Sequence, residues 1–221
     1  MSLGKWLPRE ARVRGLIRNA MPLWRHHQLI FIHIPKNGGS TISNDIYGRF
    51  LGHILYSEIQ RYSEQTVNDL RAFAVLRDPV DRFISAYNYA RYGSNDEESA
   101  IRFDHFLRVR RFQNLNTFCE HFLLTKNFKN FDQIFWPQIE FLRPCKDKAS
   151  LIHCTPIDKL HLAYADLGLK SGPSHRNFSG TNPKSRLSDS LATELYKIYK
   201  EDLRLYTQVS NSKNPVVEIS L

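Results

Sequence analysis

Short apolar runs rich in β-branched residues alternate with stretches of mixed polarity along most of the chain. Residues 29–34, 73–77 and 150–154 each form a compact apolar run of the length that is typical of a buried strand. The stretches between them carry apolar residues at helical spacing. This strand–helix alternation predicts an α/β fold, with a central parallel sheet covered by helices on both faces.

The residues that follow the first two strands predict where helices begin and end. Ile42, Ile46 and Phe50 recur at four-residue spacing, so we expect a helix that ends at Gly52. After the second strand, Asp78 is followed by a proline, which is the pattern of an N-cap and a first helical residue. The core face of this second helix is expected to consist of Val80, Phe83, Ile84 and Tyr87.

The second half of the chain is less regular. Residues 101–142 are rich in phenylalanine and histidine and are expected to be mainly helical. A helix is expected between the third strand and Gly168, and one long amphipathic helix is expected over residues 191–206. Polar composition predicts surface loops at 93–100 and 171–186.

Composition divides the chain into a basic N-terminal segment (1–28), a single domain (29–210) and a polar C-terminal tail (211–221). The first segment places apolar residues at helical spacing among arginines, which favours a basic helix packed on the domain over a membrane-surface anchor. This segment lacks the apolar stretch of a secretory signal, and the chain has no apolar run that is long enough to span a membrane. We therefore expect a cytoplasmic protein. The 3 cysteines form no CxxC pair, which favours a reducing compartment over a disulfide framework or a zinc site.

The charge balance points to an anionic partner. The chain has 221 residues with a formal net charge of +9, and 42% of its residues are hydrophobic. This apolar content excludes a disordered chain or a coiled-coil rod. The positive charge alone does not distinguish a nucleotide, a polysaccharide, a membrane or a nucleic acid.

The loop after the first strand has the composition of a phosphate-binding turn. Gly38 and Gly39 allow backbone N–H groups to converge at a helix N-terminus, where the helix dipole favours negative charge. Lys36 adds a cation, and Ser40 and Thr41 add hydroxyl donors. The loop is not a Walker A sequence, because its lysine precedes the glycines.

A second anion site is predicted at the end of the second strand. Arg77 ends this strand, and Ser85 lies about two helical turns after Asp78, on the same helix face. The arginine fork and the serine could converge on a phosphate, although a salt bridge of Arg77 with a nearby aspartate is equally consistent with the sequence. Two anion sites at neighbouring strand ends suit a nucleotide with phosphates at both ends.

These two stretches resemble the sulfotransferases. IHIPKNGGST is similar to their 5′-phosphosulfate loop, and FAVLRDPVDRFISAYNY is similar to their 3′-phosphate element. The likeness is closest to the carbohydrate sulfotransferases that include heparan sulfate 2-O-sulfotransferase and short bacterial relatives. It covers residues 29–92 convincingly, and extends more loosely to FWPQ at 135–138 and to the closing helix.

The resemblance implies a P-loop-like three-layer sandwich and 3′-phosphoadenosine 5′-phosphosulfate (PAPS) as sulfuryl donor. By this likeness, residues 36–41 (Lys36, Asn37, Gly38, Gly39, Ser40 and Thr41) hold the 5′-phosphosulfate, and Arg77 and Ser85 hold the 3′-phosphate. Lys36 would also stabilise the leaving oxygen. Asn37 departs from the family, whose loop usually has threonine there, and no metal is expected.

The acceptor would be a hydroxyl group, most simply of a carbohydrate or polysaccharide, and its proton needs a base. His53 is the candidate, on its closeness to the loop and on its likeness to bacterial relatives, with Glu58 as the alternative. The alternative interpretation is structural: His53 would only cap the C-terminus of the preceding helix, where a cation is favoured. His33 alternates with isoleucines in the first strand, so we expect it to be buried and hydrogen-bonded.

Two other functions are consistent with parts of the sequence. A P-loop-type kinase would need an acid to hold magnesium, and the strand-end acid near the loop, Asp78, already explains itself as a helix cap. A noncatalytic polyanion-binding module would leave the glycine loop unexplained. The sequence has no RNP-like, zinc-finger or helix-turn-helix pattern, so a nucleic-acid partner is not expected.

Overall fold

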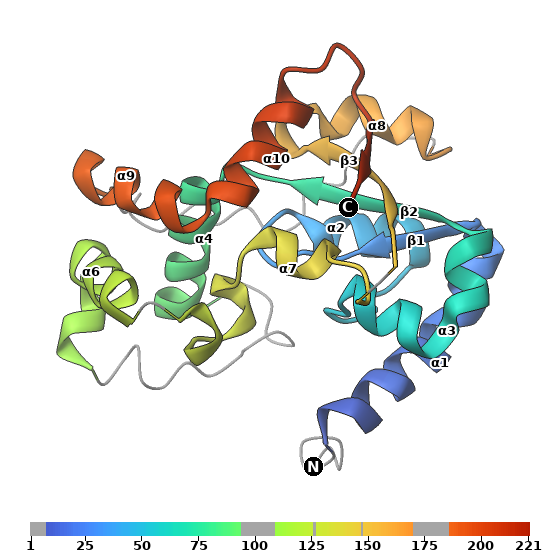
Figure 1. Ribbon diagram of the computed structural model, residues 1–221, viewed down its shortest axis with the longest axis horizontal. Coiled ribbons are helices and arrows are strands. Elements are labelled where there is room, and N and C mark those ends of the chain that lie inside the picture. The colour runs from blue at the N-terminus through green and yellow to red at the C-terminus, as the bar shows by residue number, and fades with distance from the viewer. Residues whose placement is uncertain (1–7, 94–108, 126, 147, 170–185) are drawn as a thin grey trace.

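A computed structural model describes residues 8–93, 109–125, 127–146, 148–169 and 186–221. Its centre is a four-stranded sheet in the order β1 (Leu29–Ile32), β2 (Arg71–Leu76), β3 (Leu151–Pro156) and β4 (Val217–Ser220) (Figure 1). The first three strands are parallel, with Phe31 opposite Phe73 and Phe73 opposite His153, and β4 is antiparallel to β3. The predicted α/β class and three-layer sandwich are confirmed, with one antiparallel edge strand added to the parallel sheet.

Helices connect the strands and extend beyond them (Figure 1). The α-helices are α1 (Arg9–His27), α2 (Gly39–Tyr47), α3 (Tyr56–Asp69), α4 (Pro79–Tyr92), α6 (Leu115–Thr125), α7 (Gln138–Leu142), α8 (Leu160–Asp166), α9 (Asp189–Ile198) and α10 (Lys200–Ser210). Short 3-10 turns are η3 (Arg110–Gln113), η4 (Phe128–Asn130), η5 (Gln133–Phe135) and η6 (Ile157–Lys159). None of the helices in the described ranges is long and apolar enough to cross a membrane.

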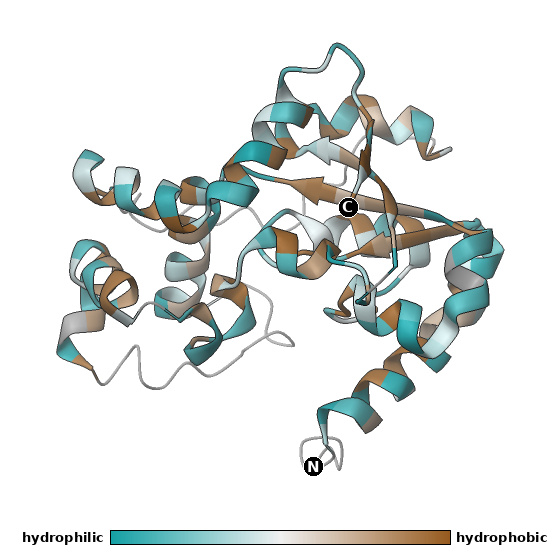
Figure 2. Cartoon of the chain, in the orientation of Figure 1, coloured by the Kyte–Doolittle hydropathy of each residue, from teal (hydrophilic) through white to brown (hydrophobic). Residues whose placement is uncertain are grey.

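Two hydrophobic cores stabilise the molecule. The strands are the most continuously apolar elements (Figure 2), and β1 and β2 centre the first core, around residues such as Ile30, Ile32 and Phe73. The second core joins α4, α6 and α9 through Phe83, Phe118 and other aromatic rings. The carboxyl ends of β1 and β2 point toward this helical part of the molecule (Figure 1), so residues at these strand ends lie between the two cores.

Two helix boundaries differ from the prediction. The helix after β1 ends at Gly48, whose φ is +72°, and not at Gly52, so Phe50 leaves the core and is 52% exposed. The predicted long C-terminal helix is divided into α9 and α10 at Tyr199, which has non-helical backbone angles. This change of direction lets α9 pack in the second core while α10 packs on the sheet.

The Asp78 cap and the N-terminal helix are found as predicted, whereas the C-terminal segment differs from the prediction. Asp78 caps α4, accepting hydrogen bonds from the backbone N–H groups of Val80 (2.9 Å) and Asp81 (3.0 Å). The basic N-terminal segment contains α1, which buries Val13 and Trp24 in the sheet core. The segment 211–221, expected as a polar tail, contains β4 and so contributes a strand to the sheet.

Several predicted stretches fall partly or wholly outside the described ranges. Nearly all of the loops expected at 93–100 and 171–186 lie there, as do residues 101–108 of the expected helical segment. The described part of that segment, 109–142, consists of short helices and 3-10 turns.

Candidate functional site

The loop between β1 and α2 is held in place by side chains from the neighbouring strand and helix. Arg82 Nε donates to the carbonyl oxygen of Pro35 (3.0 Å), and Arg77 Nη1 donates to that of Lys36 (3.3 Å). The amide of Asn37 donates to the carbonyl oxygen of Val75 (2.6 Å). These contacts support a strained turn, because Lys36 has a φ of +70°, in the left-handed region that non-glycine residues rarely adopt.

The turn delivers the chain into α2 in a conformation that suits an anion. Gly38 precedes the helix with a φ of +73°, and the first helical hydrogen bond runs from Ile42 N–H to the Gly38 carbonyl oxygen (3.3 Å). Gly38 provides no side-chain cap, and the first turn of α2 lies at the positive end of the helix dipole. In this turn Ser40 is exposed and Thr41 is buried.

Gly39 is required by packing. A Cβ atom built on Gly39 would lie 2.0 Å from Cδ2 and 2.3 Å from Nε2 of His33. The His33 ring therefore lies directly against the start of α2. His33 is buried as predicted, at 5% exposure, and its Nδ1 has no hydrogen-bond partner in the described part of the chain.

Lys36 provides the cation of the loop. Its Nζ lies 4.0 Å from the centroid of the Tyr89 ring on α4, in a cation–π contact. Burial, together with the charges of Arg77 and Arg82, lowers the pKa of Lys36 to about 8. Three cations so close together, in a partly buried site, favour a bound anion that would relieve their repulsion.

The predicted second anion site is partly assembled. Arg77 follows β2 directly, and burial lowers its pKa, against the opposing charges of Asp81 and Asp78. Its contact with the Lys36 carbonyl places the two cationic residues at the same sheet edge. Ser85 is half-buried on α4, four residues before Tyr89 and so on the same helix face, but no hydrogen bond joins its side chain to Arg77.

Asp78 is occupied by structural contacts. One carboxylate oxygen caps α4, as described above, and the other accepts a hydrogen bond from the Tyr196 hydroxyl (2.9 Å). Both oxygens are therefore used in joining α4 to α9. These contacts agree with the helix-cap interpretation of this acid.

His53 lies next to His33, the residue that follows β1. Its Nδ1 is 3.1 Å from the carbonyl oxygen of His33, and the two rings are 4.4 Å apart at their centroids. Since a carbonyl oxygen can only accept, this contact assigns the proton to Nδ1 and leaves the Nε2 lone pair as an acceptor. Burial lowers the pKa of His53 to about 4, partly offset by the hydrogen bond to His33, so the ring is neutral at pH 7.

Glu58, the alternative base, is engaged elsewhere. Its carboxylate accepts from Arg9 Nε (2.9 Å) and from the backbone N–H of Leu55 (2.9 Å), which forms a capping contact at the start of α3. The geometry therefore favours His53 over Glu58 as the group that is free to take a proton.

Sequence reasoning did not assign a role to Gln138, Tyr89 or Arg82. Gln138 and Arg82 are almost fully buried and bond to the loop or to its neighbour Arg77. For Gln138 the available signal was its place in the FWPQ stretch, where an amide follows an apolar run. For Arg82, the signal was an arginine among the core positions of a helix.

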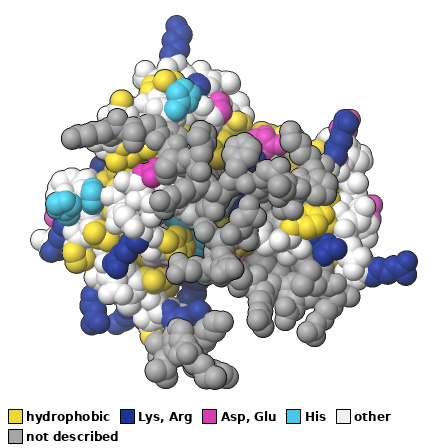
Figure 3. Space-filling model, turned by 180° about the vertical axis from the view of Figure 1, so that it is seen from behind, with side chains coloured by type: hydrophobic (Ala, Val, Ile, Leu, Met, Phe, Trp, Pro, Cys, Tyr) yellow, Lys and Arg dark blue, Asp and Glu magenta, His cyan; other side chains and the backbone are white. Residues whose placement is uncertain are grey.

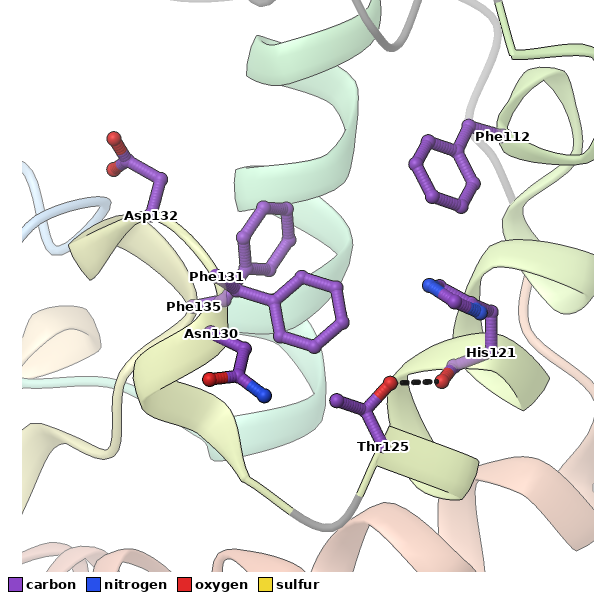
Figure 4. Close-up of a pocket in the computed structure, with 7 residues that line it drawn as sticks. All are labelled: Phe112, His121, Thr125, Asn130, Phe131, Asp132 and Phe135. Atoms are coloured by element: carbon purple, nitrogen blue, oxygen red, sulfur yellow. Dashed lines mark hydrogen bonds between the residues drawn. The ribbon is translucent and has the colours of Figure 1, made fainter.

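One cavity lies away from these residues. It measures about 330 Å³ and is enclosed by η3, α6, η4 and η5, with aromatic rings facing its interior (Figure 4). The residues lining it are Phe112, His121, Thr125, Asn130, Phe131, Asp132 and Phe135. None of the predicted site residues lines it, so this cavity does not mark the loop site.

Basic side chains are distributed around the molecule. On the face opposite to that of Figure 1, the described lysines and arginines lie around the rim, and hydrophobic and uncharged surface separates them (Figure 3). The net charge of +9 is therefore not gathered into one patch on the described part of this face. Lys36, Arg77 and Arg82 do bring positive charge together at the carboxyl ends of β1 and β2.

Comparison with known proteins identifies the family of the chain. The model of the sulfotransferase family matches residues 23–207, which is most of the chain and includes both predicted anion sites. No curated protein and no solved structure gives a significant match. With a matching family model over this length, and a glycine loop and arginine at the ends of β1 and β2, the chain belongs to the sulfotransferase family.

Proposed function

We propose that the protein transfers a sulfuryl group from PAPS to a hydroxyl group of a carbohydrate acceptor. The observation that carries this proposal is the pairing of two cationic sites at one sheet edge. The Lys36 loop and Arg77 are joined by a direct hydrogen bond of 3.3 Å, from the Arg77 side chain to the Lys36 carbonyl oxygen. A donor with a 5′-phosphosulfate and a 3′-phosphate supplies anions for both.

The loop residues fit the 5′ end of such a donor. Backbone N–H groups at the start of α2 and the exposed Ser40 hydroxyl can donate hydrogen bonds to phosphosulfate oxygens. Lys36 can approach by leaving the Tyr89 ring, its neighbour at 4.0 Å. Arg77, with Ser85 on the adjacent helix, can hold the 3′-phosphate, as the planar fork of an arginine favours.

The reaction can be balanced with groups of this chain. The acceptor oxygen attacks sulfur, its proton passes to Nε2 of His53, and the bond between sulfur and the bridging oxygen breaks. The electron pair of that bond stays on the leaving phosphate, where Lys36 and the α2 N–H groups stabilise the added charge. His53 has a pKa of about 4 in the ligand-free protein, and a bound polyanion would raise this pKa toward neutrality.

Phe50 supports a carbohydrate as the acceptor. Its ring is 52% exposed, and its centroid is 5.2 Å from that of His53. An exposed aromatic face beside the base can pack against the apolar C–H face of a sugar ring, which places a sugar hydroxyl near the base. Peripheral membrane contact through the exposed arginines of α1 remains part of this proposal, whereas a nucleic-acid partner does not.

Thermal unfolding with nucleotides tests the donor assignment. Adenosine 3′,5′-bisphosphate at a hundredfold excess over its Kd should stabilise the protein by about 2.7 kcal/mol. For a chain of this size, this corresponds to a rise in Tm of roughly 5–10 °C. Adenosine 5′-monophosphate at the same concentration should raise Tm less, because it leaves Arg77 and Ser85 without a phosphate. Equal shifts for both nucleotides would contradict the second anion site.

A further inference from the structure

Gln138 is a buried amide that contacts both halves of the candidate donor site. Its Oε1 accepts from Asn37 Nδ2 (2.6 Å) in the glycine loop and from the backbone N–H of Arg77 (3.0 Å). Its Nε2 donates to the carbonyl oxygen of Arg77 (2.8 Å). The side chain is fully buried, with 0% exposure, so both polar atoms depend on these partners.

The two bonds to Arg77 extend the sheet by one residue. The ladder between β2 and β3 ends at Leu76, which is paired with Pro156. Beyond Leu76, the side-chain amide of Gln138 forms hydrogen bonds with both the N–H and the carbonyl oxygen of Arg77, as the backbone of a neighbouring strand would. This fixes the main chain from which the Arg77 guanidinium extends.

Gln138 is itself anchored from a distant part of the chain. The carboxylate of Asp202 on α10 accepts from the backbone N–H groups of Gln138 (2.6 Å) and Ile139 (2.9 Å) at the start of α7. Asp202 is 1% exposed, and Arg82, whose charge acts on it, holds the Pro35 carbonyl oxygen of the glycine loop. Asp202, which holds Gln138, therefore interacts electrostatically with Arg82, and Arg82 in turn bonds to the glycine loop.

We propose that Gln138 is a positioning residue that fixes the spacing between the glycine loop and Arg77, and so sets the preference for a nucleotide with phosphates at both ends over one with a single 5′-phosphate. This inference rests on the donor assignment above. A single-phosphate nucleotide needs only the loop. A bisphosphate needs the loop and Arg77 at one fixed separation, so its affinity is the more sensitive to a loss of the link.

The experiment compares Gln138→Met with Gln60→Met by calorimetric titration of adenosine 3′,5′-bisphosphate and adenosine 5′-monophosphate. Methionine keeps the length of the side chain and removes its hydrogen bonds. Gln60 is a matched control, because it is 5% exposed and bonds to the backbone through both amide atoms, to Cys145 N–H (2.7 Å) and to the Ala149 carbonyl oxygen (3.2 Å). Both variants should lose stability, since each leaves buried backbone groups without partners.

Only Gln138→Met should change the ratio of the two affinities. We expect its preference for the bisphosphate to fall about tenfold, the equivalent of roughly one net hydrogen bond, with measurements made well below the Tm of each variant. Gln60→Met should keep the wild-type ratio. An unchanged ratio in Gln138→Met, or an equal fall in Gln60→Met, would overturn the positioning role.

The variant Gln138→Asn serves if the methionine variant does not fold. It keeps the amide but shortens the side chain by one methylene, so we expect it to lose its simultaneous bonds to Asn37 and to both backbone groups of Arg77. Its preference for the bisphosphate should also fall, and a wild-type ratio would overturn the proposal. A wild-type protein with no preference for the bisphosphate would instead contradict the donor assignment itself.

Discussion

Replacing Gly39 with alanine should damage the site by steric overlap alone. Gly39 is the first residue of α2 and its φ is not in the left-handed region, so alanine is acceptable to the backbone. The added Cβ would lie 2.0 Å from His33 Cδ2. To reach an ordinary contact of about 3.5 Å, the ring and the helix would have to separate by about 1.5 Å.

His33 has little room for this movement. Its ring is enclosed by Phe31, Phe50 and His53, with centroid distances of 5.8, 5.2 and 4.4 Å. Overpacking a well-filled core costs about 1–3 kcal/mol of unfolding free energy. Because His53 bonds to the His33 carbonyl oxygen, we also expect turnover to fall and bisphosphate affinity to weaken.

Gly15→Ala is a suitable control. Gly15 lies inside α1, and a Cβ atom there would meet nothing within 4 Å. This change should raise the unfolding free energy by about 0.5–1 kcal/mol, through helix propensity. Denaturant unfolding measures both variants, and His33→Ala added to Gly39→Ala should recover part of the lost stability. A Gly39→Ala protein as stable and active as wild type would refute this reasoning.

Four further predictions concern the groups around the loop and the candidate base. Tyr89→Phe should leave bisphosphate affinity nearly unchanged, whereas Tyr89→Leu should alter it by up to about tenfold through the lost contact with Lys36, as calorimetry can measure. His53→Ala should keep bisphosphate affinity and lower turnover by roughly 10²–10⁴-fold, while Glu58→Gln should mainly lower Tm. Because the folded-state pKa of His53 is about 4, its contribution to stability is complete above about pH 6.5 and is lost as pH falls toward 4, so His53→Gln should flatten this limb of a stability–pH curve. Phe50→Ala should raise the KM for a glycoside acceptor and leave that for a small alcohol unchanged; equal changes for both would argue against an acceptor-binding role.

Local patterns in the sequence were sufficient to predict several elements on which the candidate site residues lie. The glycine pair after an apolar strand predicted a turn that leads into a helix N-terminus, because glycine acts through its own backbone. The Asp78 cap was predicted for the same reason, since its bonds span only three residues. Arg77 directly follows an apolar run in the sequence, so its position at the carboxyl end of β2 could also be predicted.

The positions that depend on distant residues could not be predicted in this way. Gly48 and Gly52 both allow a helix to end, and only the packing of the following loop selects Gly48 and exposes Phe50. The contact between Lys36 and Tyr89 joins the loop after β1 to α4, and the bond from Asn37 to Gln138 spans 101 residues. Such contacts arise from tertiary packing, which periodicity does not encode.

Transfer of radiolabelled sulfate tests the central claim most directly. The protein is incubated with PAPS labelled at sulfur and with polysaccharide or glycoside acceptors, beside Lys36→Ala and His53→Ala variants. We expect label to pass from the donor to an acceptor hydroxyl, to persist in EDTA, and to fall sharply in both variants. Absence of sulfuryl transfer, together with magnesium-dependent transfer of the γ-phosphate of ATP to the same acceptors, would contradict the account.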